Sequence, residues 1–509
     1  MGRWLERSPA HRYGLVLKGM GVGLAAGLVT VLFRIALEKA DAFRQWVGGC
    51  LAERPLLLLL WLAVLLAVAG MVTLLLRWER YIGGSGIPQV EGEMQGALDP
   101  VWWRVLLAKF IGGVLSVGAG LSLGREGPSI QLGAMAGKGL ARMTRRDPTE
   151  ERMLLTCGAS AGLAAAFNAP LAGVLFSLEE LHKDFSTTVL LSSMAASITA
   201  DFLSRMVYGL GPVFDFSTVQ LLELRQYGLV LILGVLLGAV GAFYNFCIGR
   251  AQDLYRRIPS PYLRLAIPFV TAGLLLVLYP AVLGGGHDLV GMVSQEMLLQ
   301  NLLLLFVLKF LFSMVSFGSG APGGIFLPLL VLGAVVGSAS SQLFQLFGLD
   351  ALPQSFVILG MAGLFAAIVR APVTGIILIS EMSGSFSHLL SLSLVALTAY
   401  AVADLLHAKP VYDILLERLL RREPAPVRAK EGEKVLIEVP VSLGASACGK
   451  SVGALTWLGG ALIVTIRRQD REIIPHGDTV LEAGDVLALW CEADQVPAIH
   501  AAFSVHCKT

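Results

Sequence analysis

The fold is decided by KFIGGVLSVGAGLSLGREGPSIQLGAMAG, residues 109–137, together with KFLFSMVSFGSGAPGGIFLPLLVLGAVVG, residues 309–337. Lys-Phe opens both stretches, and a Gly-x-x-x-Pro step interrupts the apolar run of each at the same place. Six residues recur at an offset of 200 positions: Gly118, Gly120, Gly124, Pro128, Gly133 and Gly137 match Gly318, Gly320, Gly324, Pro328, Gly333 and Gly337. The chain therefore contains two copies of one unit, and each copy has a helix broken at the same position.

The composition is that of a membrane protein. The chain is 55% hydrophobic and 15% charged, whereas soluble domains carry about 25% charged residues. Runs long and apolar enough to cross or enter a bilayer lie near 13–33, 56–76, 102–121, 227–248, 264–283, 302–316, 324–346 and 385–404. A duplicated membrane unit with Gly/Pro-broken helices is typical of secondary transporters, whose binding sites lie at the breaks. A net charge of +2 gives no support for a nucleic-acid partner.

Charge and cysteine usage bear on topology and redox state. The polar amino terminus carries Arg3, Arg7 and Arg12, which favours a cytoplasmic location for it. The cysteines show neither a Cys-x-x-Cys motif nor metal-ligand spacing, and we expect all six to be free thiols: Cys50, Cys157, Cys247, Cys448, Cys491 and Cys507.

The sequence changes character near residue 420. We expect a membrane domain over 1–420, with repeats of roughly 15–205 and 225–415, and a Pro-rich linker over 421–432. Residues 433–509 contain alternating apolar patterns separated by turn residues, which predict strands at 435–441, 461–466 and 486–490. This part is expected to be a small α/β domain, and the basic residues that flank its tether favour the cytoplasm.

A second pair of matching segments contains an asymmetry. Ala169-Pro170-x-x-Gly173 matches Ala371-Pro372-x-x-Gly375 at an offset of 202, and at that offset Glu179 matches Glu381. Glu180, in contrast, matches Met382. The duplicated acids are expected to be scaffold, whereas an unduplicated carboxylate inside a membrane domain is a functional candidate.

The chain has three similar helix breaks, at 84–88, 124–128 and 324–328. A helix that begins at such a break presents unsatisfied backbone N–H groups and a partial positive charge. Glycines allow a ligand to approach the backbone closely, and Ser85 adds a hydroxyl donor. Several such ends that converge would bind an anion. A single break of this kind could equally be a kink or a close-packing site, but three within a repeat favour binding.

These segments resemble the anion-site signatures of the CLC family of chloride channels and chloride/proton antiporters. Further similarity lies in Phe167-Asn168-Ala169-Pro170, Arg370-Ala371-Pro372 and Lys409-Pro410-Val411-Tyr412, and it extends over roughly residues 15–420. The resemblance implies an all-α polytopic membrane fold of two inverted-topology repeats. It also implies a homodimer in the lipid bilayer with one pore per subunit.

The resemblance assigns roles to individual residues. The hydroxyls of Ser85 and Tyr412 and backbone groups would bind the central anion, so that the anion-binding set is Ser85, Gly86, Ile325, Phe326 and Tyr412. Glu126 matches the gating glutamate, which competes with the anion and takes up protons. Glu180 matches the internal proton-transfer glutamate of the antiporters. Glu91 and Lys109 match a buried charged pair, for which a purely structural role is preferred.

The chemistry of the residues supports the role of Glu126 independently. The dipoles of a helix N-terminus stabilise a carboxylate as they stabilise an anion, so that proton and anion occupancy become linked. The alternative is an ordinary carboxylate in the first turn of a helix. Arg125 either braces the loop or contacts the anion, and Phe326 either lines the pore or packs in the core.

The C-terminal region resembles the TrkA-C (RCK C-terminal) domain, a ligand-sensing module of many transporters. The similarity lies in Ile466-Arg467-Arg468, Ile474-Pro475, Gly477-Asp478-Thr479-Val480 and Gly484-Asp485. Arg467, Arg468 and His476 are candidates to bind an anionic ligand such as a nucleotide. The alternative is a solvated basic edge strand.

The function predicted from the sequence is proton-coupled chloride antiport, with chloride and protons as substrates and a cytoplasmic regulatory domain. Alternatives are a passive chloride channel on the same fold, a fluoride-specific relative, and a sensor that acts mainly through its C-terminal domain. No nucleophile–base pair, phosphate-binding loop or metal cluster appears in the sequence. We therefore expect no enzyme activity, no cofactor and no metal.

Overall fold

A computed structural model describes residues 9–146, 148–183, 186–214, 216, 219–294, 297–421, 434–442, 445–455, 461–468, 471–492, 495 and 499. The chain forms two compact units, a helical unit of residues 1–95 and 99–419 and a C-terminal unit of residues 420–509 to which residues 96–98 are also assigned. The linker expected over 421–432 lies, after Arg421, outside the described residues.

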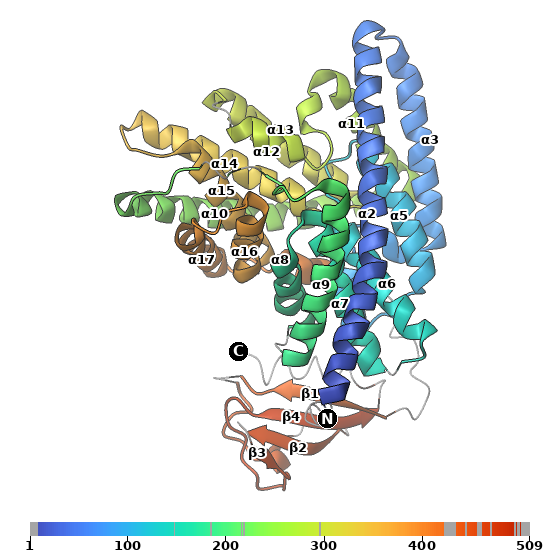
Figure 1. Cartoon of the computed structure of the whole chain (residues 1–509), viewed down its shortest axis with the longest axis vertical. Helices are drawn as coiled ribbons and strands as arrows, with labels where there is room; N and C mark the ends of the chain where they lie inside the picture. The colour runs from blue at the N-terminus through green and yellow to red at the C-terminus, as the bar shows by residue number, and fades with distance from the viewer. Residues whose placement is uncertain are drawn as a thin grey trace. The chain divides into compact units, whose positions relative to one another are not determined.

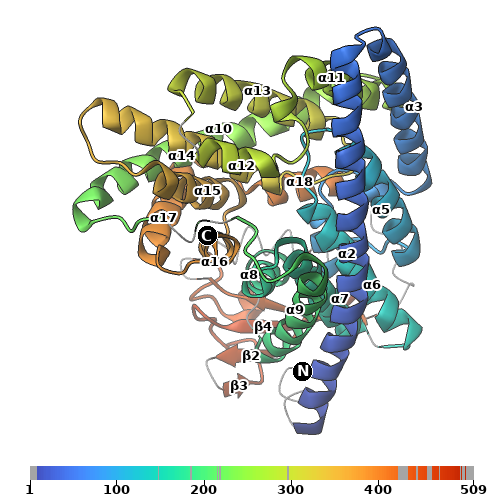
Figure 2. The same ribbon diagram turned by 45° about the horizontal axis from the view of Figure 1, so that its top comes forward.

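Within the described residues, the first half of the helical unit contains eight α-helices and two short irregular helices. They are α2 (Pro9–Glu53), α3 (Leu57–Trp78), η1 (Arg80–Ile82), α4 (Ile87–Met94), α5 (Trp102–Gly118), α6 (Glu126–Met143), α7 (Pro148–Phe167), α8 (Pro170–Phe176), the π-helix η2 (Ser177–His182) and α9 (Thr187–Tyr208). α2 and α3 run side by side along one edge of this unit (Figures 1 and 2).

The second half repeats this order. After η3 (Leu224–Gln226) come α10 (Tyr227–Arg256), α11 (Pro261–Leu278), η4 (Pro280–Val282), α12 (His287–Ser294), α13 (Leu299–Gly318), α14 (Phe326–Leu346), α15 (Pro353–Val369), α16 (Pro372–Ser383) and α17 (Leu389–Leu405). α18 (Val411–Leu420), labelled in Figure 2, follows the second repeat. Six helices among the described residues are long and apolar enough to cross a membrane: 14–53, 57–78, 224–256, 261–278, 299–318 and 326–346.

The two halves meet at the helix breaks. Gly124 and Gly324 form an antiparallel bridge in which each N–H donates to the other's carbonyl, at 2.7 and 2.8 Å. Two related bonds flank it: Gly84 N–H donates to Gly320 O, and Gly284 N–H donates to Gly120 O. Since the partners exchange between halves, the repeats are related by a local two-fold arrangement, and both Gly-x-x-x-Pro steps lie at its centre.

A buried lysine supports the same loop in each half. The ammonium of Lys109 donates to the carbonyls of Ile82 and Gly84, at 2.9 and 2.7 Å. Lys309 repeats both bonds, to Val282 O and Gly284 O, at the same two distances. Because buried carbonyls must be hydrogen-bonded, the duplicated lysines serve the structure of the loops that precede α4 and α12.

The duplicated acids tie one half to the other. Glu179 accepts hydrogen bonds from Thr374 N–H and Oγ1, at 2.8 and 2.7 Å, in the first turn of α16. Glu381 accepts bonds from Leu171 N–H and Ala172 N–H in the first turn of α8. Each carboxylate satisfies the open N-terminus of the other half's helix, which agrees with the scaffold role expected for this pair.

Close helix packing requires glycine at matching positions of the two halves. A Cβ on Gly133 would lie 2.1 Å from the carbonyl oxygen of Gly158, where α6 crosses α7. A Cβ on Gly333 would lie 2.4 Å from Gly360 O, where α14 crosses α15. These contacts bring the backbones together, as is common between membrane helices, and they hold α6 and α14 in place.

The C-terminal unit contains a four-stranded sheet with the order β1-β4-β2-β3. Its strands are β1 (Lys434–Pro440), β2 (Leu462–Arg468), β3 (Arg471–Ile473) and β4 (Val486–Glu492), and all neighbouring strands are antiparallel. The three strands predicted from alternation correspond to β1, β2 and β4. The described residues also include a 3-10 turn, Val452–Ala454, and an apolar core that contains Ile466, Leu487 and Leu489.

Candidate functional site

Three helices begin at the breaks, and their first turns are buried. α4 starts after Gly86, which has a left-handed φ of 98°, α6 starts after Arg125, and α14 starts after Ile325. Among the described residues, no side chain caps any of these three N-termini. Their free N–H groups and partial positive charges are therefore available to an anion.

The N-termini converge. A Cβ on Gly127, in the first turn of α6, would lie 2.4 Å from Ser85 Oγ and 3.3 Å from Gly324 Cα. The break before α4 therefore lies against the start of α6, and both lie against the break before α14. Residues from three distant parts of the sequence meet here, as the sequence pattern predicts.

Two buried hydroxyls accompany these helix ends. The Ser85 side chain, on a residue only 2% exposed, and the Tyr412 hydroxyl, at the start of α18, lie near each other. Within the described residues neither forms a hydrogen bond of ordinary geometry. Because buried polar groups normally have partners, two donors left open at converging helix N-termini indicate a place for an anionic ligand.

Glu126 is fully buried, with an exposed fraction of 0%, at the first position of α6. A Cβ on Gly124 would lie 2.2 Å from its Oε2, so the side chain folds back over the break. The Arg125 Nε atom is 3.9 Å from Oε1, and the backbone N–H groups of Glu126 and Leu327 face the carboxylate. Neither oxygen makes a hydrogen bond of ordinary geometry to the described residues. The charge of Arg125 and the N–H groups at the two helix starts therefore compensate this carboxylate when it is ionised.

Phe326 lies in an aromatic cluster at the start of α14. Its ring centroid is 4.7 Å from that of Phe365, 5.4 Å from Phe167 and 6.0 Å from Phe176. Phe176 in turn packs edge-on against Tyr412, at 6.4 Å. The side chain of Phe326 therefore packs in the core, while its backbone N–H lies at the helix end. That it lines the pore remains a prediction.

Glu180 lies in the π-helix η2, Ser177–His182, where the matching helix of the second half, α16, remains a regular α-helix. π-Bulges are frequent at functional sites because they redirect side chains. The Glu180 residue is 6% exposed, and its Oε1 has no hydrogen-bond partner in the part of the chain that the structure describes. Tyr412 lies close enough to both Glu180 and Glu126 to interact electrostatically with each of them.

The pairing of Glu91 with Lys109 that the resemblance implies is wrong. Lys109 binds the two carbonyls described above, whereas Glu91 accepts a 2.7 Å bond from Lys183. Lys183 also donates to Asp413, at 3.1 Å. Sequence reasoning missed both Lys183 and Asp413, because no repeat or motif distinguishes them.

Arg125 borders a cavity of about 1080 Å³. Other charged or polar residues of the wall include Arg34, Asp41, Arg44, His287 and Asp288. The Nε atom of Arg125 has no hydrogen-bond partner among the described residues. This geometry leaves both of its alternatives, a brace for the loop or an anion contact, as predictions.

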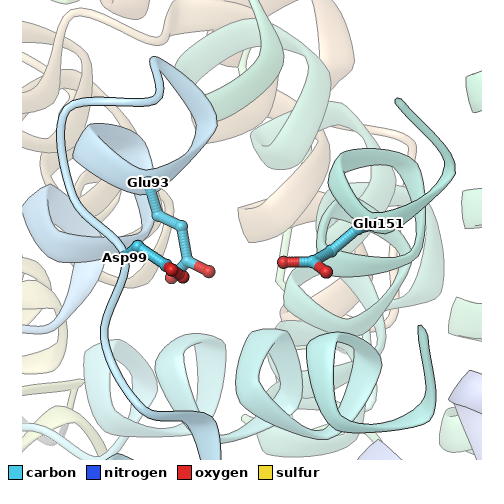
Figure 3. Close-up of side chains that lie close together, drawn as sticks. All are labelled: Glu93, Asp99 and Glu151. Atoms are coloured by element: carbon cyan, nitrogen blue, oxygen red, sulfur yellow. The ribbon is translucent and has the colours of Figure 1, made fainter. Parts of the chain in front are cut away.

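Glu93, Asp99 and Glu151 form the one acidic cluster, within the described residues, whose carboxylates lie close enough together to suggest a metal (Figure 3). Two basic side chains already neutralise these carboxylates. The Lys138 ammonium pairs with Glu93 and Asp99, and Arg142 pairs with Asp99 and Glu151. The cluster is therefore an ion-pair network that joins α4, α6 and α7.

In the C-terminal unit, Arg468 forms hydrogen bonds and ion pairs with residues of the same domain. Its Nε and one terminal nitrogen each donate to an oxygen of Asp485 at 2.8 Å, and it also binds Glu482 and Val480 O. Burial alone would raise the pKa of Asp485, but the hydrogen bonds and charge of Arg468 and the N–H of Glu482 outweigh burial, and the pKa is lowered. A ligand contact by Arg468 would have to compete with this bidentate pair. His476 lies in an exposed turn closed by Thr479, and ligand binding by Arg467 and His476 stays a prediction.

Comparisons with known proteins agree with this geometry. Residues 67–404 match the family model described as voltage gated chloride channel, and residues 436–504 match the TrkA-C domain. An H(+)/Cl(-) exchange transporter, ClcA, of Vibrio cholerae is 37% identical over 427 residues, which is 81% of this chain and 91% of that protein. The corresponding transporter of Klebsiella pneumoniae is 36% identical over 436 residues, 82% of this chain and 91% of that protein.

A solved structure has the same fold. The crystal structure of a slow cyanobacterial Cl-/H+ antiporter superposes with a TM-score of 0.77 at 33% identity, and covers 80% of this chain and 98% of that one. The residues that converge at the helix breaks, the family model and the solved relative lead to one conclusion: the chain belongs to the CLC family of voltage gated chloride channels and carries a C-terminal TrkA-C domain.

Proposed function

We propose that this protein exchanges chloride for protons across a membrane. The observation that carries the proposal is a set of buried groups at converging helix N-termini that have no hydrogen-bond partner among the described residues: the hydroxyls of Ser85 and Tyr412 and the carboxylate of Glu126. Its relatives in Vibrio and Klebsiella are named as H(+)/Cl(-) exchange transporters, and the superposed structure is that of an antiporter.

Chloride is bound by the start of α4 and α14 together with two hydroxyls. Ser85 and Tyr412 donate O–H bonds, and the backbone at Gly86, Ile325 and Phe326 supplies helix-end N–H groups and dipoles. Because dipoles rather than a buried cation compensate the ion, the site holds chloride without holding it too tightly for release.

Two unduplicated acids, Glu126 and Glu180, carry the proton. When ionised, Glu126 occupies the anion pathway over Gly124, and when protonated it leaves, so that one position alternates between a carboxylate and chloride. Glu180 passes the proton to the cytoplasmic side. An orphan buried carboxylate on a π-helix, close to Tyr412, supports this role.

The test is a reversal-potential measurement on purified protein in planar bilayers or liposomes under crossed chloride and pH gradients. An exchanger reverses at a potential that both gradients determine. A passive channel reverses at the chloride equilibrium potential whatever the pH gradient, and that result would replace antiport by the channel alternative.

We also propose that the functional unit is a homodimer in the plasma membrane of a prokaryote. The support is membership of the family and the bacterial relatives. Cross-linking or native mass spectrometry of the protein in lipid nanodiscs would report two copies per particle. A monomer that transports at the full rate would contradict the dimer.

The C-terminal domain is proposed to be cytoplasmic and to regulate transport through an anionic ligand, a nucleotide being the first class to screen. The match to TrkA-C and the cationic and imidazole groups of Arg467 and His476 support this role. A ligand can regulate only if it binds two transport states unequally. Deletion after residue 430 should leave exchange intact and remove the response to any ligand found. If no nucleotide alters thermal stability or flux of the full chain, the regulatory role fails.

A further inference from the structure

Lys183 lies at the junction of three elements that carry the proposed transport chemistry. It follows the π-helix that holds Glu180, and it has a left-handed φ of 54° at the C-terminal end of that helix. Its ammonium donates to Glu91 on α4, at 2.7 Å, and to Asp413 on α18, at 3.1 Å. α4 begins just after Ser85, and Asp413 follows Tyr412 directly.

The burial of these groups is graded. The Lys183 side chain is 45% exposed and that of Asp413 is 39% exposed, whereas that of Glu91 is 1% exposed and the Glu180 residue 6%. The pair of Lys183 and Asp413 is therefore partly exposed to solvent, whereas Glu91 and Glu180 are buried. Within the described residues, Glu180 interacts electrostatically with Lys183, Glu91, Asp413 and Glu179, and its charge also acts on Tyr412.

We infer that Lys183 is a positioning residue that sets the ease with which Glu180 exchanges its proton with the cytoplasm. The inference rests on the proposed antiport. Among the described residues that act electrostatically on Glu180, Lys183 is the one cation beside three carboxylates. It favours the ionised carboxylate, while Asp413, Glu91 and Glu179 favour the protonated one. Glu179 is already held by the N-terminus of α16. The partly exposed pair of Lys183 and Asp413 therefore acts on the proton of Glu180 in opposite directions, Lys183 favouring its release and Asp413 its retention.

The experiment compares substitutions of opposite charge in full-length protein reconstituted in liposomes. Chloride flux and chloride-driven proton movement are followed with separate electrodes while the pH on the cytoplasmic side is varied. Lys183→Met removes the cation, so Glu180 retains its proton more tightly. The midpoint of coupled proton flux should move to higher pH by about one unit, the lower end of the effect of an adjacent charge.

Asp413→Asn removes an anion and should move the midpoint in the opposite direction, to lower pH, by a smaller amount. Lys183→Arg should stay near the wild type, and the double variant Lys183→Met with Asp413→Asn should lie between the single ones. Chloride flux should change less than about two-fold in all of them, because the anion ligands are untouched. These opposite signs distinguish a charge effect from a merely structural one, which would impair both variants in the same direction.

Lys409→Met is the matched control. Lys409 is an exposed lysine just before α18, and its ammonium pairs with Glu417 at 2.8 Å. It is not one of the charged residues that act on Glu180. It should leave the midpoint unchanged. If Lys183→Met and Asp413→Asn keep the wild-type midpoint, or shift it in the same direction, the inference is overturned while antiport stands. If Lys183→Met does not fold, the sign of the Asp413→Asn shift decides alone. A wild-type protein without coupled proton movement would overturn the proposed function, and this inference with it.

Discussion

The two halves of the membrane unit share their scaffold and differ in their chemistry. The lysines that hold the breaks are present twice with the same bonds in each copy, and the acids that cap the facing helices are present twice with matching bonds from two backbone N–H groups. The groups proposed for transport occur once: Glu126 matches Phe326, Glu180 matches Met382, and Ser85 matches Gly285. The frame around the breaks is thus symmetric, whereas these three groups lie in the first half only.

The largest effect is expected at the gate. Glu126→Gln should abolish proton coupling and leave a chloride flux that no longer depends on pH, because the amide imitates the protonated acid at every accessible pH. Phe326→Leu, at the matching position of the other half, should keep coupling even if flux changes. Flux measured over a range of pH in liposomes tests both, and a Glu126→Gln protein that retains the wild-type pH dependence would remove Glu126 from the gate.

The scaffold lysines should be equivalent. Lys109→Met and Lys309→Met each leave two buried carbonyls without a donor, at a cost of about 1–3 kcal/mol per group. Both should lower the thermal unfolding temperature in detergent, and by similar amounts. The exposed Lys409→Met should have little effect. A large drop for one buried lysine and none for the other would show that the duplicated bonds are not equivalent.

A smaller effect is expected at the anion site. Ser85→Ala with Tyr412→Phe removes two hydroxyl donors, each worth at most about 1.5–3 kcal/mol toward a charged acceptor. Helix N–H groups share the load, so we expect chloride affinity by calorimetry to fall about ten-fold or somewhat more. Ser338→Ala, whose hydroxyl already donates to Val293 O, serves as the control. Unchanged chloride affinity in the double variant would place the site elsewhere.

The smallest effect lies in the C-terminal domain, outside the repeat comparison. Because the pKa of Asp485 is lowered in the folded protein, its pair with Arg468 stabilises the fold above the ordinary pKa of aspartate and is lost as the pH falls through the lowered value. Asp485→Asn should therefore destabilise the sheet at neutral pH, by about 1–2 kcal/mol. Hydrogen exchange of β2 and β4 in the full chain measures this change. Glu482→Gln, on an exposed carboxylate, should change protection less, and equal effects of the two would contradict the account.

Much of the site was predictable because it depends on repetition and on glycine. The breaks, the scaffold acids and the unduplicated Glu180 can be found by aligning the chain with itself. The three helix N-termini follow from Gly-x-x-x-Pro, since a proline that starts a helix and glycines before it have few other uses.

What the sequence could not predict depends on side-chain partners across long distances. Lys109 binds carbonyls rather than Glu91, because its loop brings the carbonyls of Ile82 and Gly84 to it. Lys183 and Asp413 are 230 positions apart, and no repeat or motif in the sequence links them. The π-helix around Glu180 has no sequence signature, and the engagement of Arg468 by Asp485 depends on strand register.

The central claim is that an unduplicated acid carries the proton, and Glu180→Gln tests it most directly. Liposomes with a chloride gradient would be followed with a pH electrode, with Met382→Gln as the counterpart in the second half. The account predicts that Glu180→Gln still moves chloride but no longer drives protons, whereas Met382→Gln does both. Chloride-driven proton movement at the wild-type ratio in Glu180→Gln would contradict it.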